Sequence, residues 1–311
     1  SKNENKLDLN KLGINLTTKK IQLIEIINFD EEFTLQNIAE VYFDEEINFT
    51  DYKETKNLEI IQAAYNEIVF NTKIKATNTS ITLPIELFKV FQVPIDNSLL
   101  YQDQIHQLKW EYTKLFPMDE VDEVVLQFYE VAKNSIIPYS SAIVVSTRRK
   151  YLKLLNNFCL KNFLNLVHID NAHFASDKAI EIVESLSERS LVLSLYYMNN
   201  YLSIEILFFG KPIFIKIFRI KNVNDIPEVL TQEVLNNLRI VGNRQIEVAY
   251  FIGEELSHNL VNEIQMRLNI NFRINNPFAN LQIENSIRTN ELFLEKYNSF
   301  SAATGIALRL S

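Results

Sequence analysis

The segment of residues 12–27, LGINLTTKKIQLIEII, constrains the fold of this 311-residue chain more than any other. Ile14 and Leu16 alternate with polar residues before a Thr-Thr-Lys-Lys stretch, and Ile21 and Leu23 do so after it. An apolar period of two is typical of strands, and a short polar stretch between two such runs is typical of a turn. The segment therefore predicts a β-hairpin with one buried face near the start of the chain.

One order of elements occurs twice along the sequence: three strands, a helix and a further strand. In the first half, after the hairpin, we expect a strand at 40–49, a helix at 57–71 and a strand at 79–83. In the second half, we expect strands at 191–196, 202–208 and 213–220, a helix from about residue 225, and a strand at 246–252. Two such units predict an α/β chain with two mixed sheets and right-handed crossovers.

Residues 84–137 interrupt the first half and read as an insertion. We expect within it a short helix at 85–91, an amphipathic helix at 103–115 and a strand at 124–131. The apolar run at 141–146 is typical of a strand buried on both faces, and we expect it to resume the first half. The insertion is therefore predicted to be a small α/β subdomain.

Composition excludes several classes of protein. A formal net charge of -8 without a basic stripe argues against a nucleic-acid surface. A single cysteine, Cys159, cannot form an internal disulfide, and no apolar run reaches 18 residues. We therefore expect a cytoplasmic chain with no transmembrane segment.

Glycine is scarce, with five residues where average usage of about 7% would give roughly twenty. Loops that bind phosphate need glycine where backbone N–H groups approach the anion. The turn of the first hairpin contains none. The composition therefore disfavours a nucleotide site.

Several motifs give the chain a resemblance to a known family. These are Ile81-Thr82-Leu83-Pro84, the later Val93-Pro94, the LFPMDEV sequence of residues 115–121, the LNLVHIDNAHFA sequence of 164–175 and the closing FSAATGIALR of 300–309. In this order they resemble the PilM family of actin-like proteins in type IV pilus assembly, which is related to the cytoplasmic domain of GspL from type II secretion.

The resemblance implies a two-lobe, actin-like (ribonuclease-H-like) fold with the insertion as subdomain 1C. Residues 1–83 and 138–175 would form the first lobe, 84–137 the subdomain, and 176–311 the second lobe. Members of the family bind the short cytoplasmic tail of a bitopic membrane protein, PilN, beside the subdomain, and most bind ATP. The chain is therefore expected to lie at the inner membrane through its partner.

The nucleotide motifs of the family are altered at all three positions. Asn15 replaces the acid that organises Mg²⁺, and Thr17, Thr18 and Lys19 follow it. Ser194-Leu195-Tyr196 corresponds to the second phosphate motif and lacks both its acid and its glycine. Gly253-Glu254 corresponds to the adenosine motif and adds a carboxylate. These losses favour a non-catalytic scaffold that needs neither cofactor nor metal.

Alternatives remain open at this point. In a working ATPase of the same machinery, Thr17, Thr18 and Lys19 would hold the phosphates of ATP with Mg²⁺. A division protein of the FtsA type or a sugar kinase fits less well, and an unrelated α/β interaction module is a third class. Alternatively, Thr17, Thr18 and Lys19 simply form an ordinary polar turn of the hairpin, without binding a phosphate.

The remaining candidate residues concern a partner and a metal. In the insertion, Trp110 is the expected anchor for a partner peptide, and further contacts are expected from Phe88, Asp119 and Glu120. His168, Asp170 and His173 lack the spacing of a known zinc motif, so we expect structural roles for them.

Overall fold

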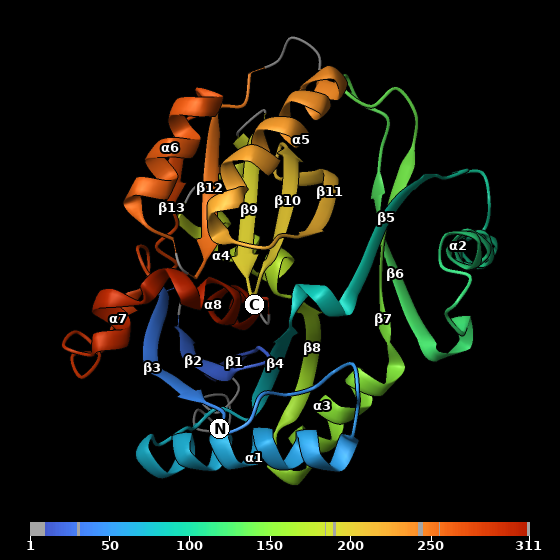
Figure 1. Cartoon of the computed structure of the whole chain (residues 1–311). Coiled ribbons are helices and arrows are strands. Elements are labelled where there is room, and N and C mark those ends of the chain that lie inside the picture. Colours follow the sequence, from blue (N-terminus) through green and yellow to red (C-terminus); the bar gives the residue numbers. More distant parts are fainter. Residues whose placement is uncertain are drawn as a thin grey trace. The chain divides into compact units, whose positions relative to one another are not determined.

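The computed structural model describes residues 10–29, 32–183, 185–188, 191–241, 245–254 and 256–309. The chain divides into two compact units (Figure 1). The first comprises Ser1–Ile85, Tyr151–Glu184 and Asn275–Ser311, and the second comprises Glu86–Lys150 and Ser185–Ile274. The insertion thus groups with the second half of the chain, and the C-terminal residues group with the first half.

The first unit is built on a six-stranded mixed sheet in the order β14-β3-β2-β1-β4-β8. Its strands are β1 (Asn10–Leu16), β2 (Lys20–Phe29), β3 (Glu32–Tyr42), β4 (Asn78–Leu83), β8 (Asn165–Asn171) and β14 (Gln282–Ile283). The predicted hairpin is confirmed as β1 and β2, which pair antiparallel with Asn15 opposite Gln22. The third strand ends at Tyr42, so the strand predicted at 40–49 is wrong over most of its length.

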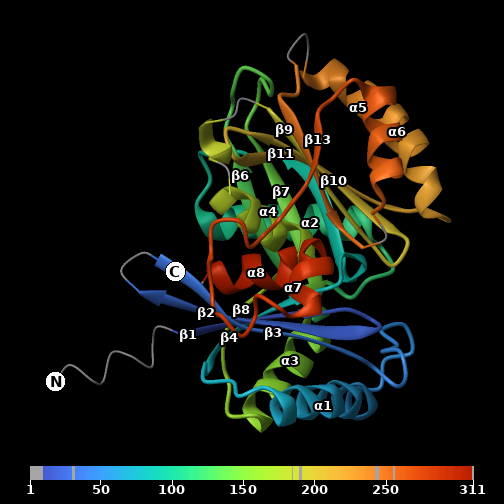
Figure 2. The same cartoon turned by 90° about the vertical axis from the view of Figure 1, so that its left-hand side faces the viewer.

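Helices cover both faces of this sheet, as Figure 2 shows. On one face lie α1 (Glu54–Asn71) and α3 (Arg149–Lys161), and on the other lies α8 (Ser301–Leu308). The unit also contains α4 (Ala172–Val183) and α7 (Glu291–Glu295). Because both faces are covered, every residue of β1 is buried, and the prediction of a single buried face is wrong.

The second unit contains a five-stranded sheet in the order β11-β10-β9-β12-β13. Its strands are β9 (Val192–Met198), β10 (Tyr201–Phe208), β11 (Lys211–Arg219), β12 (Val248–Gly253) and β13 (Phe272–Ile274), and its helices include α5 (Ile226–Val241) and α6 (His258–Leu268). This order matches β3-β2-β1-β4-β8 of the first unit strand for strand. The internal symmetry predicted from the sequence is therefore confirmed.

A separate three-stranded sheet in the order β5-β7-β6 belongs to the second unit. It consists of β5 (Phe88–Pro94), β6 (Val124–Val131) and β7 (Ser141–Arg148), and α2 (Tyr101–Leu115) packs on it through Leu108. The helix predicted at 85–91 is wrong, because residues 88–94 pair with β7 along their whole length. The apolar run at 141–146 is a strand as predicted, but it is the centre of this small sheet.

Helix α8 is fully buried between the six-stranded sheet and α4. A Cβ on Gly13 of β1 would lie 2.0 Å from the carbonyl oxygen of Ala303, and a Cβ on Gly305 would lie 1.7 Å from that of Ala175. Two of the five glycines thus allow α8 to approach β1 on one side and α4 on the other. No helix in the described part of the chain is long and apolar enough to cross a membrane.

Candidate functional site

The turn between β1 and β2 is closed by its own side chains. The hydroxyl oxygen of Thr17 accepts hydrogen bonds from the backbone N–H groups of Lys19 and Lys20, at 3.1 and 3.0 Å. The same hydroxyl donates to the carbonyl oxygen of Lys20 at 3.1 Å. In a phosphate loop, backbone N–H groups of this kind face the anion. In this turn, two of them are already bonded inside the protein.

Asn15, at the position of the expected Mg²⁺-organising acid, is fully buried and hydrogen-bonded at both ends of its amide. Its Nδ2 donates to Oε1 of Gln22 at 2.9 Å, and its Oδ1 accepts from the hydroxyl of Thr82 at 2.7 Å. An amide also lacks the charge that attracts a hydrated divalent cation. Asn15 is therefore a structural link between neighbouring strands.

These contacts continue as a polar ladder, which we define as Thr82, Asn15, Gln22 and Glu40 on β4, β1, β2 and β3. Each residue stands beside the next in the sheet register. Nε2 of Gln22 donates to a carboxylate oxygen of Glu40 at 2.9 Å and to the hydroxyl of Ser299 at 3.0 Å. The ladder thus crosses four strands without a break in hydrogen bonding.

Two lysines end the ladder at Glu40. The ammonium of Lys20 lies 2.7 Å from one carboxylate oxygen, and that of Lys296 lies 3.1 Å from the other. The side chains of Lys20 and Glu40 are only 3% and 2% exposed. Burial raises the pKa of Glu40, but the charge of Lys20 and hydrogen bonds from Lys20, Gln22 and Lys296 outweigh it and lower the pKa overall.

The second altered motif lies entirely within strand β9. Ser194 and Tyr196 are buried, with Tyr196 beside Ser203 of β10 and Ile252 of β12. Asn199 and Asn200 connect β9 to β10, and both have positive φ (51° and 63°), as in a tight hairpin turn. A two-residue turn next to a buried tyrosine leaves no glycine-lined backbone for a phosphate.

The surroundings of Tyr196 are acidic. Burial raises the pKa of its hydroxyl, and the nearby carboxylates of Glu254 and Glu86 raise it further. Burial also raises the pKa of Glu86 to about 7. Negative charge near this strand, from Glu254 and from the ionised fraction of Glu86, opposes the binding of a phosphate group.

The third altered motif is held by a close backbone approach. Gly253 has a φ of +127°, and a Cβ there would lie 1.9 Å from the carbonyl oxygen of Tyr197. The N–H of Glu254 donates to that same oxygen at 3.2 Å. Gly253 is therefore explained by the packing of β12 against β9, without a ligand.

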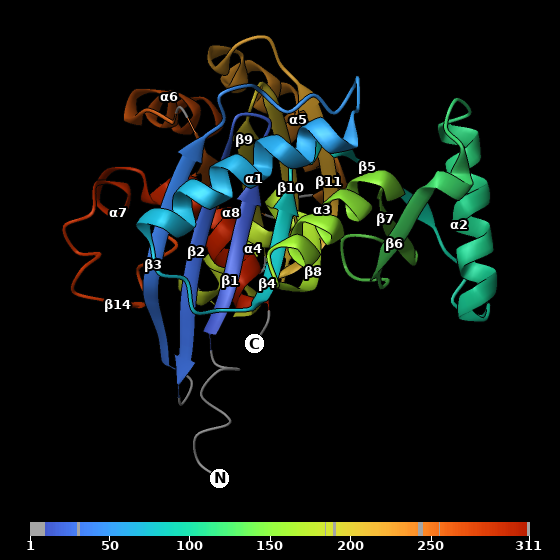
Figure 3. The same cartoon turned by 90° about the horizontal axis from the view of Figure 1, so that it is seen from below.

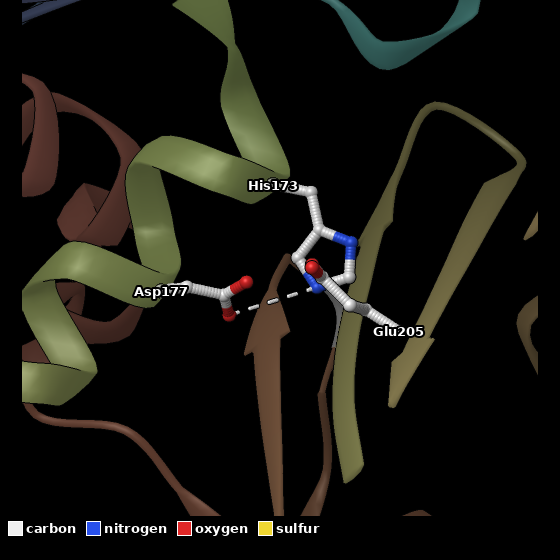
Figure 4. A group of neighbouring side chains, drawn as sticks. All are labelled: His173, Asp177 and Glu205. Carbon is white, nitrogen blue, oxygen red and sulfur yellow. Dashed lines mark ion pairs between the residues drawn. The ribbon is translucent and has the colours of Figure 1, made fainter. Parts of the chain in front are cut away.

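The predicted metal candidates do not gather into one group. Nε2 of His173 lies 3.9 Å from Oδ1 of Asp177, one turn further along α4, as the dashed line in Figure 4 shows. Burial lowers the pKa of His173, although Asp177 acts in the opposite direction. Asp170 pairs with Arg309, and His168 is exposed on β8. Glu205, also drawn in Figure 4, belongs to the second unit.

The predicted partner residues have different environments. Asp119 contacts the ammonium of Lys89 and the hydroxyl of Tyr112, lies 3.6 Å from Arg148, and is 8% exposed. The negative charge of Asp119 is therefore neutralised by basic residues within the subdomain. Glu120 is exposed, and Phe88 is half-buried on β5.

Trp110 is 57% exposed on α2 and lies beside the ammonium of Lys114, which is 5.3 Å from the ring centroid. Leu115 and Met118, which follow at the end of the helix, are also exposed. The predicted anchor is therefore accessible, with further apolar side chains beside it in the sequence.

Sequence reasoning missed Gln22 and Glu40 of the ladder, and Lys296, which pairs with Glu40. The alternation of β2 placed Gln22 on a polar face that was expected to meet solvent. Glu40 was placed in a strand, but its partner Lys296 is 256 residues away in the chain. Only the strand register and the fold bring these groups together.

Comparisons with known proteins agree with the fold. No family model and no curated protein matches the sequence. Among solved structures, a PilM-PilN type IV pilus biogenesis complex is similar with a TM-score of 0.72 and 17% identity, covering 96% of this chain and 98% of that one. A Bacteroides thetaiotaomicron protein with an actin-like ATPase fold and unknown function has a TM-score of 0.55 and 13% identity, covering 97% of each chain.

A third solved structure is the ethanolamine utilization protein EutJ from Carboxydothermus hydrogenoformans. It has a TM-score of 0.51 and 9% identity, and covers 96% of this chain and 89% of that one. The chain therefore has the predicted actin-like fold, with a full-length structural likeness to PilM at low sequence identity.

Proposed function

We propose that this chain is a non-catalytic, actin-like scaffold of a type IV pilus or type II secretion assembly platform at the inner membrane. The observation that carries the proposal is the closed turn between β1 and β2, in a fold similar to that of a PilM-PilN complex. The scaffold would bind the cytoplasmic tail of a PilN-like bitopic membrane protein. Neither ATP nor Mg²⁺ is needed for this role.

The first and second altered motifs support the loss of nucleotide binding for different reasons. The Thr17 hydroxyl occupies backbone N–H groups, Asn15 is engaged by Gln22 and Thr82, and Tyr196 fills the second strand among carboxylates. A working ATPase would have to break several buried hydrogen bonds before it could accept a phosphate. A buried donor or acceptor that loses its hydrogen bond raises the free energy of the folded protein. This cost favours the scaffold over the ATPase.

The exposed Trp110 supports the partner part of the proposal. Aromatic side chains that are exposed in the free protein and buried in a complex contribute strongly to binding. The exposed carboxylate of Glu120 adds a charge for a basic residue of the tail. Asp119 would contribute indirectly, because it holds Lys89 and Tyr112.

The partner surface is tested by Trp110→Ala. The probe is a synthetic peptide with the sequence of the cytoplasmic tail of a PilN-like bitopic membrane protein, and affinity is measured by calorimetry. We expect binding to weaken at least about tenfold, because a buried tryptophan contact contributes about 2 kcal/mol or more. Met266→Ala on α6, another exposed apolar side chain, is the control and should bind as the wild type does. Equal affinity of the Trp110 variant would contradict this surface.

A further inference from the structure

Three apolar side chains on or just after α1 and α3 of the first unit are highly exposed to solvent. Seen from below in Figure 3, the two helices lie side by side. Phe70, at the end of α1, is 89% exposed, and Phe163, just after α3, is 91% exposed. Leu160 in the last turn of α3 is 65% exposed. So much exposed apolar area on a folded unit marks a contact surface.

The topology brings these side chains to one edge of the sheet. Helix α1 is followed by β4 and α3 by β8, and these parallel strands begin side by side with Asn78 opposite Asn165. The N–H of Asn165 also donates to the carbonyl oxygen of Thr77. Both helices therefore end toward this edge of the sheet. Helix α3 ends beside β8, and the residues after α1 contact β3, where Nδ2 of Asn37 donates to the carbonyl oxygen of Lys73.

The same edge is basic within an acidic chain. Residues 67–77 and 160–169 contain three lysines and one glutamate, although the chain has a net charge of -8. Lys73, Lys75 and Lys161 are all exposed, as is Glu67. We define the helix-end surface as these three lysines with Phe70, Leu160 and Phe163. Its charge is complementary to an anionic partner.

Phe163 is held in an unfavourable backbone conformation. Its φ is +56°, in the left-handed region where glycine or asparagine is preferred. The N–H of Leu164 donates to the carbonyl oxygen of Cys159 at 2.9 Å and that of Phe163 to Leu160 at 3.3 Å, which closes α3 with a Schellman motif. A bulky, exposed aromatic residue at such a position reduces stability and is not needed for the core. Its presence points to binding.

We propose that the helix-end surface binds directly to the surface of an anionic phospholipid bilayer. Protruding phenylalanine and leucine side chains would enter the boundary between head groups and acyl chains, and the lysines would face the lipid phosphates. A bilayer is favoured over an acidic protein because Phe70 and Phe163 project almost fully into solvent, and a protein partner would have to supply a pocket for each. This contact is independent of the partner tail and of nucleotide binding.

The experiment is co-sedimentation of the full chain with phosphatidylcholine vesicles, with and without phosphatidylglycerol. We expect binding only to the anionic vesicles, weakened by salt. Phe163→Gly should weaken it about tenfold, the effect of withdrawing one aromatic side chain from the membrane interface. The same change should raise the midpoint of thermal unfolding by about 2–4 °C, because glycine suits the left-handed position. A merely structural role of Phe163 would not give opposite changes in stability and binding.

A second variant tests the charge. Lys161→Gln should weaken vesicle binding about fivefold, the effect expected for one lysine at an anionic surface. The controls are Met266→Ser and Lys211→Gln in the second unit, which replace an exposed apolar and an exposed basic residue elsewhere and should bind as the wild type does. Equal binding to neutral vesicles, no binding, or unchanged binding by the Phe163 variant would overturn the proposal. A Phe163-dependent complex with an acidic protein, without vesicle binding, would overturn it too.

Discussion

Gly305→Ala is expected to lower the free energy of unfolding by about 3 kcal/mol. The added Cβ would lie 1.7 Å from the carbonyl oxygen of Ala175 and 3.2 Å from the backbone nitrogen of Ala179. Both atoms belong to the backbone of α4, so no side-chain rotation can relieve the overlap. Helix α8 would have to move, although it is fully buried and packed against β1 on its other side. Urea unfolding of the full chain measures the change.

The control for this variant lies at the neighbouring position of the same helix. Among the described residues, no hydrogen-bond partner reaches the buried hydroxyl of Thr304, so the nearly isosteric Thr304→Val should leave stability unchanged or raise it. If Gly305→Ala were as stable as the wild type, the close approach of α8 and α4 would be refuted. If Thr304→Val were destabilised as much as Gly305→Ala, any substitution in α8 would lower stability, and the loss could not be attributed to the Cβ added at position 305.

Glu40→Gln is expected to destabilise the first unit by about 3–5 kcal/mol. The substitution keeps the shape of the side chain but removes the charge that neutralises Lys20, whose side chain is 3% exposed. A buried ammonium that loses its carboxylate is costly, because water cannot replace the lost interaction. The exposed pair of Lys216 and Glu233, 3.1 Å apart, provides the control. Glu233→Gln should change stability by less than about 1 kcal/mol.

The same substitution should change the response to acid. The pKa of Glu40 is lowered in the folded state, so its contribution is complete above the unfolded value of about 4.3 and is lost as pH falls through the folded value. The wild type should therefore lose stability below about pH 4.3 more steeply than Glu40→Gln. Parallel curves would show that folding does not lower the pKa of Glu40, and would contradict its pairing with Lys20. The double variant Lys20→Met, Glu40→Gln should lose less than the sum of the single changes.

The sequence predicted much of the fold because its strongest patterns depend on local contacts. Alternation identified β1, β2 and the β9–β11 meander, and helical spacing identified α1 and α2. The helix predicted at 85–91 was wrong because a short apolar run fits a helix or a strand. Pairing of residues 88–94 with β7, whose paired residues lie 47 to 59 positions later, decides between them. Acidic Asp44, Glu45 and Glu46 follow Tyr42, and the strand predicted there stops at that residue.

The sequence predicted which residues belong to the candidate site, but not which contacts those residues make. Motif correspondence singled out Asn15 and Thr17 as altered positions. Nothing local indicated that Asn15 joins Thr82 and Gln22, or that the Thr17 hydroxyl binds the N–H groups of its own turn. Asp119 was predicted only as a contact for a partner, and nothing local indicated that Lys89 and Arg148 pair with it inside the subdomain.

The most direct test of a scaffold without nucleotide is isothermal titration of the full chain with ATP and Mg²⁺. The closed turn, the buried amide of Asn15 and the acidic surroundings of Tyr196 predict no measurable binding at millimolar nucleotide. The protein should also bind the partner tail equally well with and without ATP. Micromolar affinity for Mg²⁺-ATP, lost on Thr18→Ala, would contradict the account and support an active ATPase.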